Sequence, residues 1–191
     1  MTPVTSHLGG PAEAQLKGKF CLNTKPLVRR VSNRFLHLLA RMSPGATTLR
    51  PFLHRLRGVT IHGGVFISDG VYIDNEYPEC VEIHEGVQIG IRTIILAHTK
   101  GTGRVILERF AYLGPNSIVL GPPGRTLTVG EGSVAAAGSV ITTSVPSYTL
   151  VRGNPAIPVA KVTIPLSLTD DYEQFLTGLI PIKKTTARVA E

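Results

Sequence analysis

The sequence predicts an all-β fold, a three-sided parallel β-helix, with a helical extension before it and a short helix after it. Three observations lead to this prediction. An aliphatic residue returns at every sixth position between Ile61 and Pro146, the residue four places later is usually small or β-branched, and the phase survives short interruptions. The aliphatic positions fall into four groups of three: Ile61, Ile67, Ile73; Ile83, Ile89, Ile95; Leu107, Leu113, Val119; and Val129, Ala135, Ile141.

A six-residue unit is too short to bury an apolar face by itself, so it must stack on copies of itself. The groups begin at residues 61, 83, 107 and 129, so successive turns of the coil are 22, 24 and 22 residues long. We expect the aliphatic residues to point inward, with each strand pairing with its copy one turn away. A sandwich of alternating strands would lose this phase at each interruption.

The second position of the pattern should lie inside the corners of the coil. It is occupied by Val65, Val71, Val87, Thr93, Thr99, Ala111, Ser117, Ser133, Ser139 and Val145. The extra residues of each turn are expected in inserted loops at Tyr77–Glu82, Gly101–Leu107 and Gly121–Thr128.

The segments outside the repeat favour helices. Apolar residues at helical spacing from Leu27 to Met42 face a basic and polar side, which describes an amphipathic helix that ends at Ser43-Pro44-Gly45. A second short helix is expected over Thr47–Leu56, and residues 1–24 should be loosely ordered. These segments form an N-terminal extension over residues 1–58, ahead of the β-helix over residues 59–162.

The period fails after Pro146, and a turn followed by extended chain is expected over Tyr148–Val162. In the C-terminal tail, residues 163–191, Asp170 and Asp171 should cap a short helix that runs through Leu179. Residues 183–191 are expected to be frayed.

The net charge of +7 is unevenly distributed. Residues 1–60 hold ten Lys/Arg and one acid, whereas residues 61–191 hold ten Lys/Arg and twelve acids. No interleaved aromatics or recognition motif supports nucleic-acid binding. Contact of the basic N-terminal helix with an anionic membrane surface is the better functional interpretation, and a merely solvated helix face is the alternative.

Composition favours a cytoplasmic protein. The chain has no run of about 18 apolar residues, which a membrane span needs, and its start lacks the apolar core of a secretory signal. Cys21 and Cys80 are too few for a disulfide framework.

Three features together resemble the hexapeptide-repeat acyltransferases, in particular the galactoside/maltose acetyltransferase-like and polysaccharide O-acetyltransferase branch. They are the repeats, the segment Ile94–Thr99 and the closing motif Gly153-Asn154-Pro155-Ala156. The likeness covers about residues 57–162. It implies a left-handed parallel β-helix, a homotrimer, and acetyl-CoA or another acyl-CoA in the groove between neighbouring prisms, without a metal. It also implies acyl transfer to a hydroxyl of a small-molecule or saccharide acceptor.

The resemblance carries roles onto particular positions. His98 matches the general base, and Gly114 matches the glycine of the turn that faces the thioester. The transient oxyanion needs a backbone N–H, which we expect from the turn that carries Gly114. Residues matching the CoA-binding positions are Ala136, Ala137, Gly138, Ser139 and Thr142. Pro115, Thr143 and Ala160 depart from the family pattern, so Arg125, Arg152 or Lys161 would have to replace the missing CoA charge partners.

A general base at His98 requires a second residue that orients its imidazole. An alcohol is a weak nucleophile while protonated, and an imidazole that accepts its proton must be oriented through its other nitrogen. Glu76 occupies on the first turn the place that His98 occupies on the second, so we predict that it orients the imidazole, with Asp74 as the second candidate. In the same insertion, Asn75 and Tyr77 either bind acceptor hydroxyls or form a structural corner.

His62 and His84 follow equivalent inward residues, so we expect an outward polar ladder and no metal. Three readings remain beside O-acyl transfer: an N-acyltransferase that uses the same base, a zinc enzyme like the γ-carbonic anhydrases with His98 as third ligand, and a non-catalytic β-helix scaffold.

Overall fold

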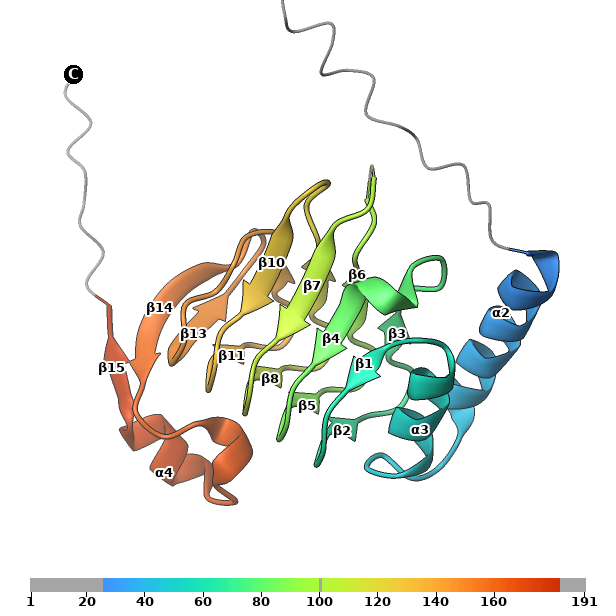
Figure 1. Ribbon diagram of the computed structural model, residues 1–191. Coiled ribbons are helices and arrows are strands. Elements are labelled where there is room, and N and C mark those ends of the chain that lie inside the picture. Colours follow the sequence, from blue (N-terminus) through green and yellow to red (C-terminus); the bar gives the residue numbers. More distant parts are fainter. Residues whose placement is uncertain (1–25, 100, 183–191) are drawn as a thin grey trace, which may run out of the picture.

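The computed structural model describes residues 26–99 and 101–182, and these form a three-sided parallel β-helix with helices at both ends (Figure 1). The strands belong to three sheets, one for each side of the prism. The first sheet contains β1 (Thr60–Ile61), β4 (Val81–Ile83), β7 (Arg104–Leu107) and β10 (Thr126–Val129). The second contains β2 (Phe66–Ile67), β5 (Gln88–Ile89), β8 (Tyr112–Leu113) and β11 (Val134–Ala135), and the third contains β3 (Tyr72–Ile73), β6 (Ile94–Leu96), β9 (Ile118–Leu120) and β12 (Val140–Ile141).

The register of these sheets confirms the repeat predicted from the sequence. Ile61 pairs with Ile83, and Ile83 pairs with Leu107, so each inward residue lies directly above its counterpart on the next turn. All twelve predicted inward residues are buried in one hydrophobic core. Burial of apolar surface contributes roughly 25 cal/mol per Å² to the free energy of folding. The continuous column of buried residues therefore stabilises the stacking of the short strands.

The corner positions are also buried, with one exception. Thr99 is exposed, and the residue that fills the core at this point is Ala97. The chain leaves the prism directly after Ala97, where the N–H of Gly103 returns to donate to the Ala97 carbonyl (2.8 Å). The longest insertion therefore starts directly after Ala97, two residues before Thr99, which the strict period assigns to the corner.

The insertions are shorter than predicted. Strand β4 begins at Val81, β7 at Arg104 and β10 at Thr126, so the last residues of each predicted loop belong to strands. A short 3-10 helix, Pro78–Cys80, precedes β4. Glu82 is therefore a strand residue and not a loop residue. It points outward and lies in register with Thr60.

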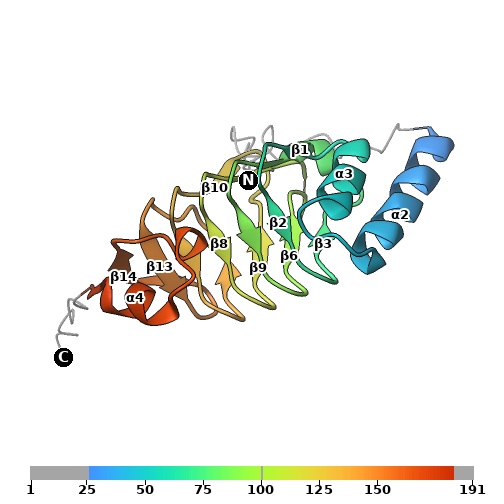
Figure 2. The same cartoon turned by 90° about the horizontal axis from the view of Figure 1, so that it is seen from below.

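Two helices cover the N-terminal end of the coil, and α2 is the outermost element (Figure 2). Helix α2 spans Leu27–Met42, as predicted, and α3 spans Leu49–Leu56, two residues shorter at its start. The buried residues of α2 are Asn33, His37 and Ala40, so this helix packs inward with its more polar side. Burial and the nearby Arg57 and Arg41 lower the pKa of His37 to about 3, which keeps its imidazole neutral at physiological pH.

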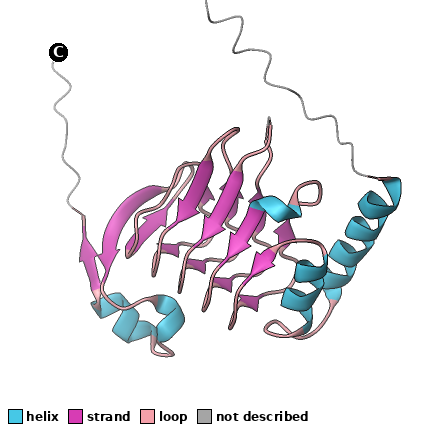
Figure 3. Ribbon diagram, in the orientation of Figure 1, coloured by secondary structure: helices cyan, strands magenta, loops and turns pink. Residues whose placement is uncertain are grey.

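The C-terminal end of the coil is closed by an extension of the second sheet that changes from parallel to antiparallel pairing (Figure 3). Strand β13 (Thr149–Arg152) pairs with β11 and then with β14 (Ile157–Val162), which pairs with β15 (Leu179–Pro181). The 3-10 helix Leu166–Leu168 and helix α4 (Tyr172–Thr177) lie between β14 and β15. Asp171 caps α4 as predicted, accepting hydrogen bonds from Glu173 N and Gln174 N, but the helix ends before Leu179. The predictions for residues 1–24 and 183–191, including Cys21, lie outside the described residues.

No helix in the described ranges is both long and apolar enough to cross a membrane.

Candidate active site

The prism has three corners, and each collects a different set of candidate residues. The first corner follows strands of the first sheet and includes residues 62–65 and 84–87. The second corner follows strands of the second sheet and includes residues 114–117 and 136–139. The third corner follows strands of the third sheet, carries the insertions, and includes residues 74–80, 97–99, 101–103, 121–125 and 142–145.

His98 lies on the third corner, where β6 ends and the longest insertion begins. Its Nδ1 is 2.5 Å from Oδ2 of Asp74, on the preceding turn of the coil. The Asp74 side chain is fully buried, whereas that of His98 is 31% exposed. The Tyr77 ring meets the imidazole edge-on, with 5.1 Å between ring centroids. A buried carboxylate thus holds one nitrogen of an imidazole that remains accessible.

Asp74 is held firmly by the backbone around it. Its Oδ1 accepts hydrogen bonds from Glu76 N (2.9 Å) and Tyr77 N (3.0 Å), and its Oδ2 also accepts from Ala97 N (2.9 Å). Because both oxygens are fixed, the carboxylate determines the position of the imidazole. A proton on Nδ1 is shared with Asp74, and this tautomer leaves Nε2 as the acceptor nitrogen.

The partner of His98 is therefore Asp74, and the prediction of Glu76 for this contact is wrong. Glu76 Oε1 lies 3.2 Å from the Arg34 guanidinium of α2. Asp74 and Glu76 lie on the same turn of the coil, but only Asp74 contacts Nδ1 of His98. The corner turn after β3 fixes the Asp74 side chain, because its Oδ1 accepts hydrogen bonds from the N–H groups of Glu76 and Tyr77, two and three residues further along the chain.

The contacts of Asn75 are those of a structural corner, one of the two roles expected for this residue. Its Oδ1 accepts a hydrogen bond from Arg57 Nη2 (2.8 Å), and its backbone carbonyl accepts from Asn33 Nδ2 (2.7 Å). Arg57 is buried and also donates to the backbone carbonyls of Ile73 and Asp74. Burial lowers the pKa of Arg57 to about 10, which leaves it charged at neutral pH. Asn75 thus joins the helical extension to the first turn, behind the His98–Asp74 pair.

The residues predicted to bind CoA lie mostly on the second corner. Ala137 and Gly138 are exposed there, Ala136 is half-buried, and Ser139 is buried with its hydroxyl donating to the Ala136 carbonyl (2.7 Å). Gly114 is buried, and a Cβ at this position would lie 2.6 Å from Ala137 N. Close stacking of successive turns is therefore what requires glycine at position 114.

In the turn where an oxyanion donor is expected, the N–H groups of residues 114, 116 and 117 are engaged within the coil. The Gly114 N–H already donates to the Ala135 carbonyl (2.8 Å), and Pro115 has no N–H. The next two N–H groups, of Asn116 and Ser117, donate to the carbonyls of Ile91 and Gly114. This corner turn uses these groups to close the coil.

Thr142 and Arg125 come together on the third corner. They line one open depression with Pro122, Thr126, Leu127, Thr143 and Ser144. Arg152 is exposed at the end of β13, next to the second corner. Within one chain, the His98–Asp74 pair and the residues 136–139 thus occupy different corners.

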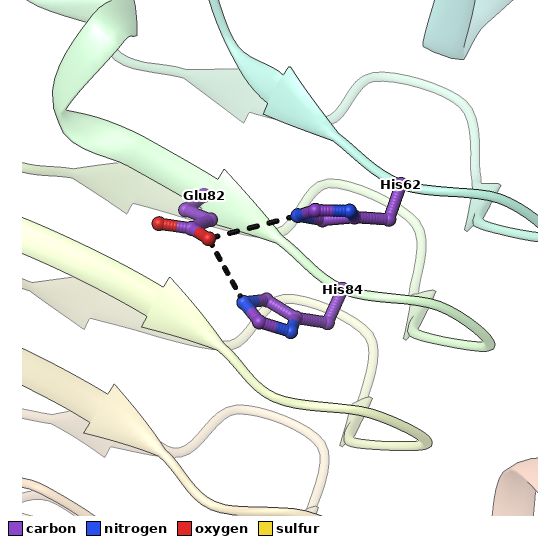
Figure 4. Close-up of side chains that lie close together, drawn as sticks. All are labelled: His62, Glu82 and His84. Carbon is purple, nitrogen blue, oxygen red and sulfur yellow. Dashed lines mark hydrogen bonds and ion pairs between the residues drawn. The ribbon is translucent and has the colours of Figure 1, made fainter.

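His62 and His84 occupy the first corner, as the predicted outward ladder requires (Figure 4). Their ring centroids are 4.7 Å apart. Glu82 lies between them, with Oε1 3.0 Å from His84 Nε2 and 3.6 Å from His62 Nε2. Within one chain, His98 lies on another corner, away from His62 and His84. Sequence reasoning missed Glu82 because it assigned this residue to a loop.

Comparison with known proteins points to acetyltransferases, although no protein-family model matches the chain. The chain is 29% identical over 149 residues to serine acetyltransferase 2 of Arabidopsis thaliana, covering 74% of this chain and 42% of that protein. It is 28% identical to the putative acetyltransferase YvoF of Bacillus subtilis, over 69% of this chain and 77% of YvoF. The chain spans less than half the length of the plant serine acetyltransferases that it matches.

Among solved structures, the hexapeptide-repeat acetyltransferase VCA0836 of Vibrio cholerae, in complex with acetyl-CoA, shares the fold. The TM-score is 0.57 with 23% sequence identity, and the match covers 75% of this chain and 88% of that chain.

Proposed function

Because this chain is a hexapeptide-repeat β-helix related in sequence to acetyltransferases, we propose that it is a CoA-dependent O-acyltransferase with His98 as general base. The observation that carries the proposal is the contact between the accessible His98 imidazole and the buried Asp74 carboxylate. The proposed acyl donor is an acyl-CoA, with acetyl-CoA as the preferred candidate. The proposed acceptor is a hydroxyl of a small molecule or saccharide.

The reaction proceeds by direct attack. Nε2 of His98 takes the proton of the acceptor hydroxyl as that oxygen bonds to the thioester carbonyl carbon. Asp74 stabilises the imidazolium that forms, because its carboxylate already accepts the Nδ1 proton. When the carbon–sulfur bond breaks, the CoA thiolate takes the proton back from Nε2, which leaves an ester, free CoA and a neutral imidazole. The step needs no metal and no covalent enzyme intermediate.

We propose a homotrimer as the active form. The proposed base lies on the third corner and the proposed pantetheine-binding residues 136–139 lie on the second, so one chain does not bring them together. A groove between the third corner of one prism and the second corner of its neighbour would do so. The acyl-CoA would then lie along the coil axis, with the Arg125–Thr142 depression available to its phosphates.

Acyl-CoA binding provides the test of this function. We expect saturable acetyl-CoA binding by calorimetry and release of free CoA thiol with hydroxyl acceptors. Arg125→Ala should weaken acetyl-CoA about tenfold, since a hydrogen bond to a charged group contributes about 1.5–3 kcal/mol. Arg109→Ala, an exposed arginine beside the first corner, is the matched control and should leave the affinity unchanged.

Other outcomes of this test identify the alternatives. Transfer to amines but not to hydroxyls would establish N-acylation, for which the same base serves. A stable oligomer that binds no acyl-CoA would establish a scaffold and overturn the proposed function.

The outer side of the N-terminal helices supports contact with a membrane surface. Seven of the eight large apolar residues of α2 are exposed, each with between 42% and 80% of its surface accessible: Leu27, Val28, Val31, Phe35, Leu38, Leu39 and Met42. Leu49, Phe52 and Leu56 of α3 are exposed as well. Soluble monomers rarely expose so many large apolar side chains on adjoining elements.

Charge supports an anionic bilayer as the proposed occupant of this surface. Arg29, Arg30, Arg34 and Arg41 are exposed on α2, and no acid occurs in residues 14–68. Each arginine near an anionic leaflet contributes about 1 kcal/mol of attraction. Two copies of the same basic surface would repel each other. We propose that α2 lies in the membrane interface with its apolar side inserted.

Vesicle sedimentation tests this contact. Wild-type protein should bind phosphatidylserine-containing vesicles, release them as salt rises, and ignore neutral vesicles. A Val31→Glu, Phe35→Glu variant should bind at least about tenfold more weakly, because each side chain contributes about 1.5–3 kcal/mol when it is buried. Ile180→Glu, an exposed isoleucine at the far end of the coil, is the control. A change of oligomer mass in the double variant would instead assign this surface to a second copy.

A further inference from the structure

The side chains of His62, Glu82 and His84 converge on the first corner, away from His98 (Figure 4). One ligand atom from each lies within 4.8 Å of the other two. The cluster follows from the coil itself. Glu82 and His84 are two residues apart along an extended strand, so their side chains share a face. His62 lies one turn before His84, so its side chain stacks directly on it.

The spacing of these atoms matches the first coordination sphere of zinc. With Zn–N and Zn–O bonds of about 2.0–2.1 Å in a tetrahedron, neighbouring donor atoms are about 3.3 Å apart. Glu82 Oε1 is 3.0 Å from His84 Nε2 and 3.6 Å from His62 Nε2, on either side of that value. Small side-chain rotations would bring all three atoms onto one ion, with water as the fourth ligand.

The surroundings prepare the carboxylate for this role. Arg104 Nη2 lies 2.5 Å from Glu82 Oε2, the oxygen that faces away from the histidines, and so fixes the orientation of the carboxylate. Such contacts behind a ligand orient it for the metal.

The open position of the site and the identity of its ligand atoms favour Zn²⁺. His62 and His84 line an open depression with Gly63, Glu85 and Arg109, so an ion and its water can enter from solvent. Two imidazole nitrogens with one carboxylate oxygen suit Zn²⁺, whereas Mg²⁺ and Ca²⁺ prefer oxygen ligands throughout. Glu85 is paired with Arg109 (3.3 Å) and stays outside the proposed ligand set.

We propose that His62, Glu82 and His84 form a zinc site that joins the first two turns of the β-helix. The ion would connect the loop after β1 to the strand β4 and the residue that follows it, at the end of the coil where β1 is an edge strand. Because an ion that binds only the folded state stabilises it, the site would strengthen this end of the coil. The site is separate from the proposed acyl transfer, and neither depends on the other.

Calorimetry on the tag-free, chelator-treated full chain tests the site with ZnCl₂ as probe. We expect one Zn²⁺ per chain, a rise in the midpoint of thermal unfolding, and no saturable binding of Mg²⁺. His84→Ala and Glu82→Gln should each weaken zinc at least about tenfold, since the loss of even an outer contact costs that much. In both variants, the rise in the unfolding midpoint should disappear.

Two matched controls make the result specific. His98→Ala removes a histidine from the third corner, and Glu85→Gln removes an acid of the same depression outside the ligand set. Both should bind zinc as the wild-type protein does. The proposal is overturned if zinc does not saturate, if binding persists in His84→Ala and Glu82→Gln, or if it is lost in His98→Ala.

Discussion

Replacing His98 with alanine should lower kcat for acyl transfer by about 10²–10⁴-fold, the range typical for loss of a general base. The acceptor hydroxyl would then have to lose its proton to water, because Asp74 is fully buried behind the imidazole. The dissociation constant of acetyl-CoA should stay within about twofold, since the proposed contacts of the cofactor are elsewhere. Steady-state kinetics with the best acceptor, together with calorimetry, measure both quantities.

Stability should be nearly unaffected by His98→Ala, because the imidazole is partly exposed and packs mainly on Tyr77 and Asp74. An unchanged unfolding midpoint therefore separates lost chemistry from lost structure. Full turnover by this variant would remove His98 from the mechanism, whatever the fate of the fold.

Asp74→Asn should produce the second large effect, a loss of about 10²-fold or more in kcat with the KM for acetyl-CoA unchanged. The amide that replaces Oδ2 would direct N–H groups at Ala97 N and His98 Nδ1, where the carboxylate accepts two hydrogen bonds. The imidazole then loses both its orientation and the stabilisation of its charged form. Asp74 acts through His98, so it is a positioning residue.

A double-mutant cycle distinguishes positioning from a general structural defect. Once His98 is alanine, Asp74→Asn should cost no further activity, because residues that act as a unit are not additive. Some loss of stability, about 1–3 kcal/mol, is expected because the backbone N–H of Ala97 loses its acceptor. Glu76→Gln is the matched control and should change kcat less than about threefold. Comparable losses in Glu76→Gln and Asp74→Asn would contradict the role assigned to Asp74.

The architecture follows from local patterns, which is why it could be predicted. The repeat of six identifies the inward residues, and the lengths of 22, 24 and 22 residues set the register, because strands of a coil pair only with their own copies one turn away. The helix Leu27–Met42 follows in the same way from apolar spacing and a Ser-Pro-Gly stop. Hydrophobic periodicity is a property of neighbouring residues, so the chain alone specifies it.

The repeat does not determine which side chains meet at the corners. The period places Glu76 and His98 at equivalent positions, but local hydrogen bonds to the corner backbone direct Asp74 at the imidazole instead. Which corner carries which residue was also settled only when the strand boundaries were known, as Glu82 between the two histidines illustrates. These contacts depend on side-chain direction where the repeat is interrupted.

What the amino-acid sequence determined by itself is the coil, its core and the turn on which the candidate base lies, because each follows from a repeating burial pattern. Only the tertiary structure decided that Asp74 holds His98, that Glu82 meets His62 and His84, and that α2 turns its apolar side away from the prism. The physical reason is common to all three. A side chain is directed by the particular groups it meets, and some of these groups lie on another turn or another element, as His98 does 24 residues after Asp74.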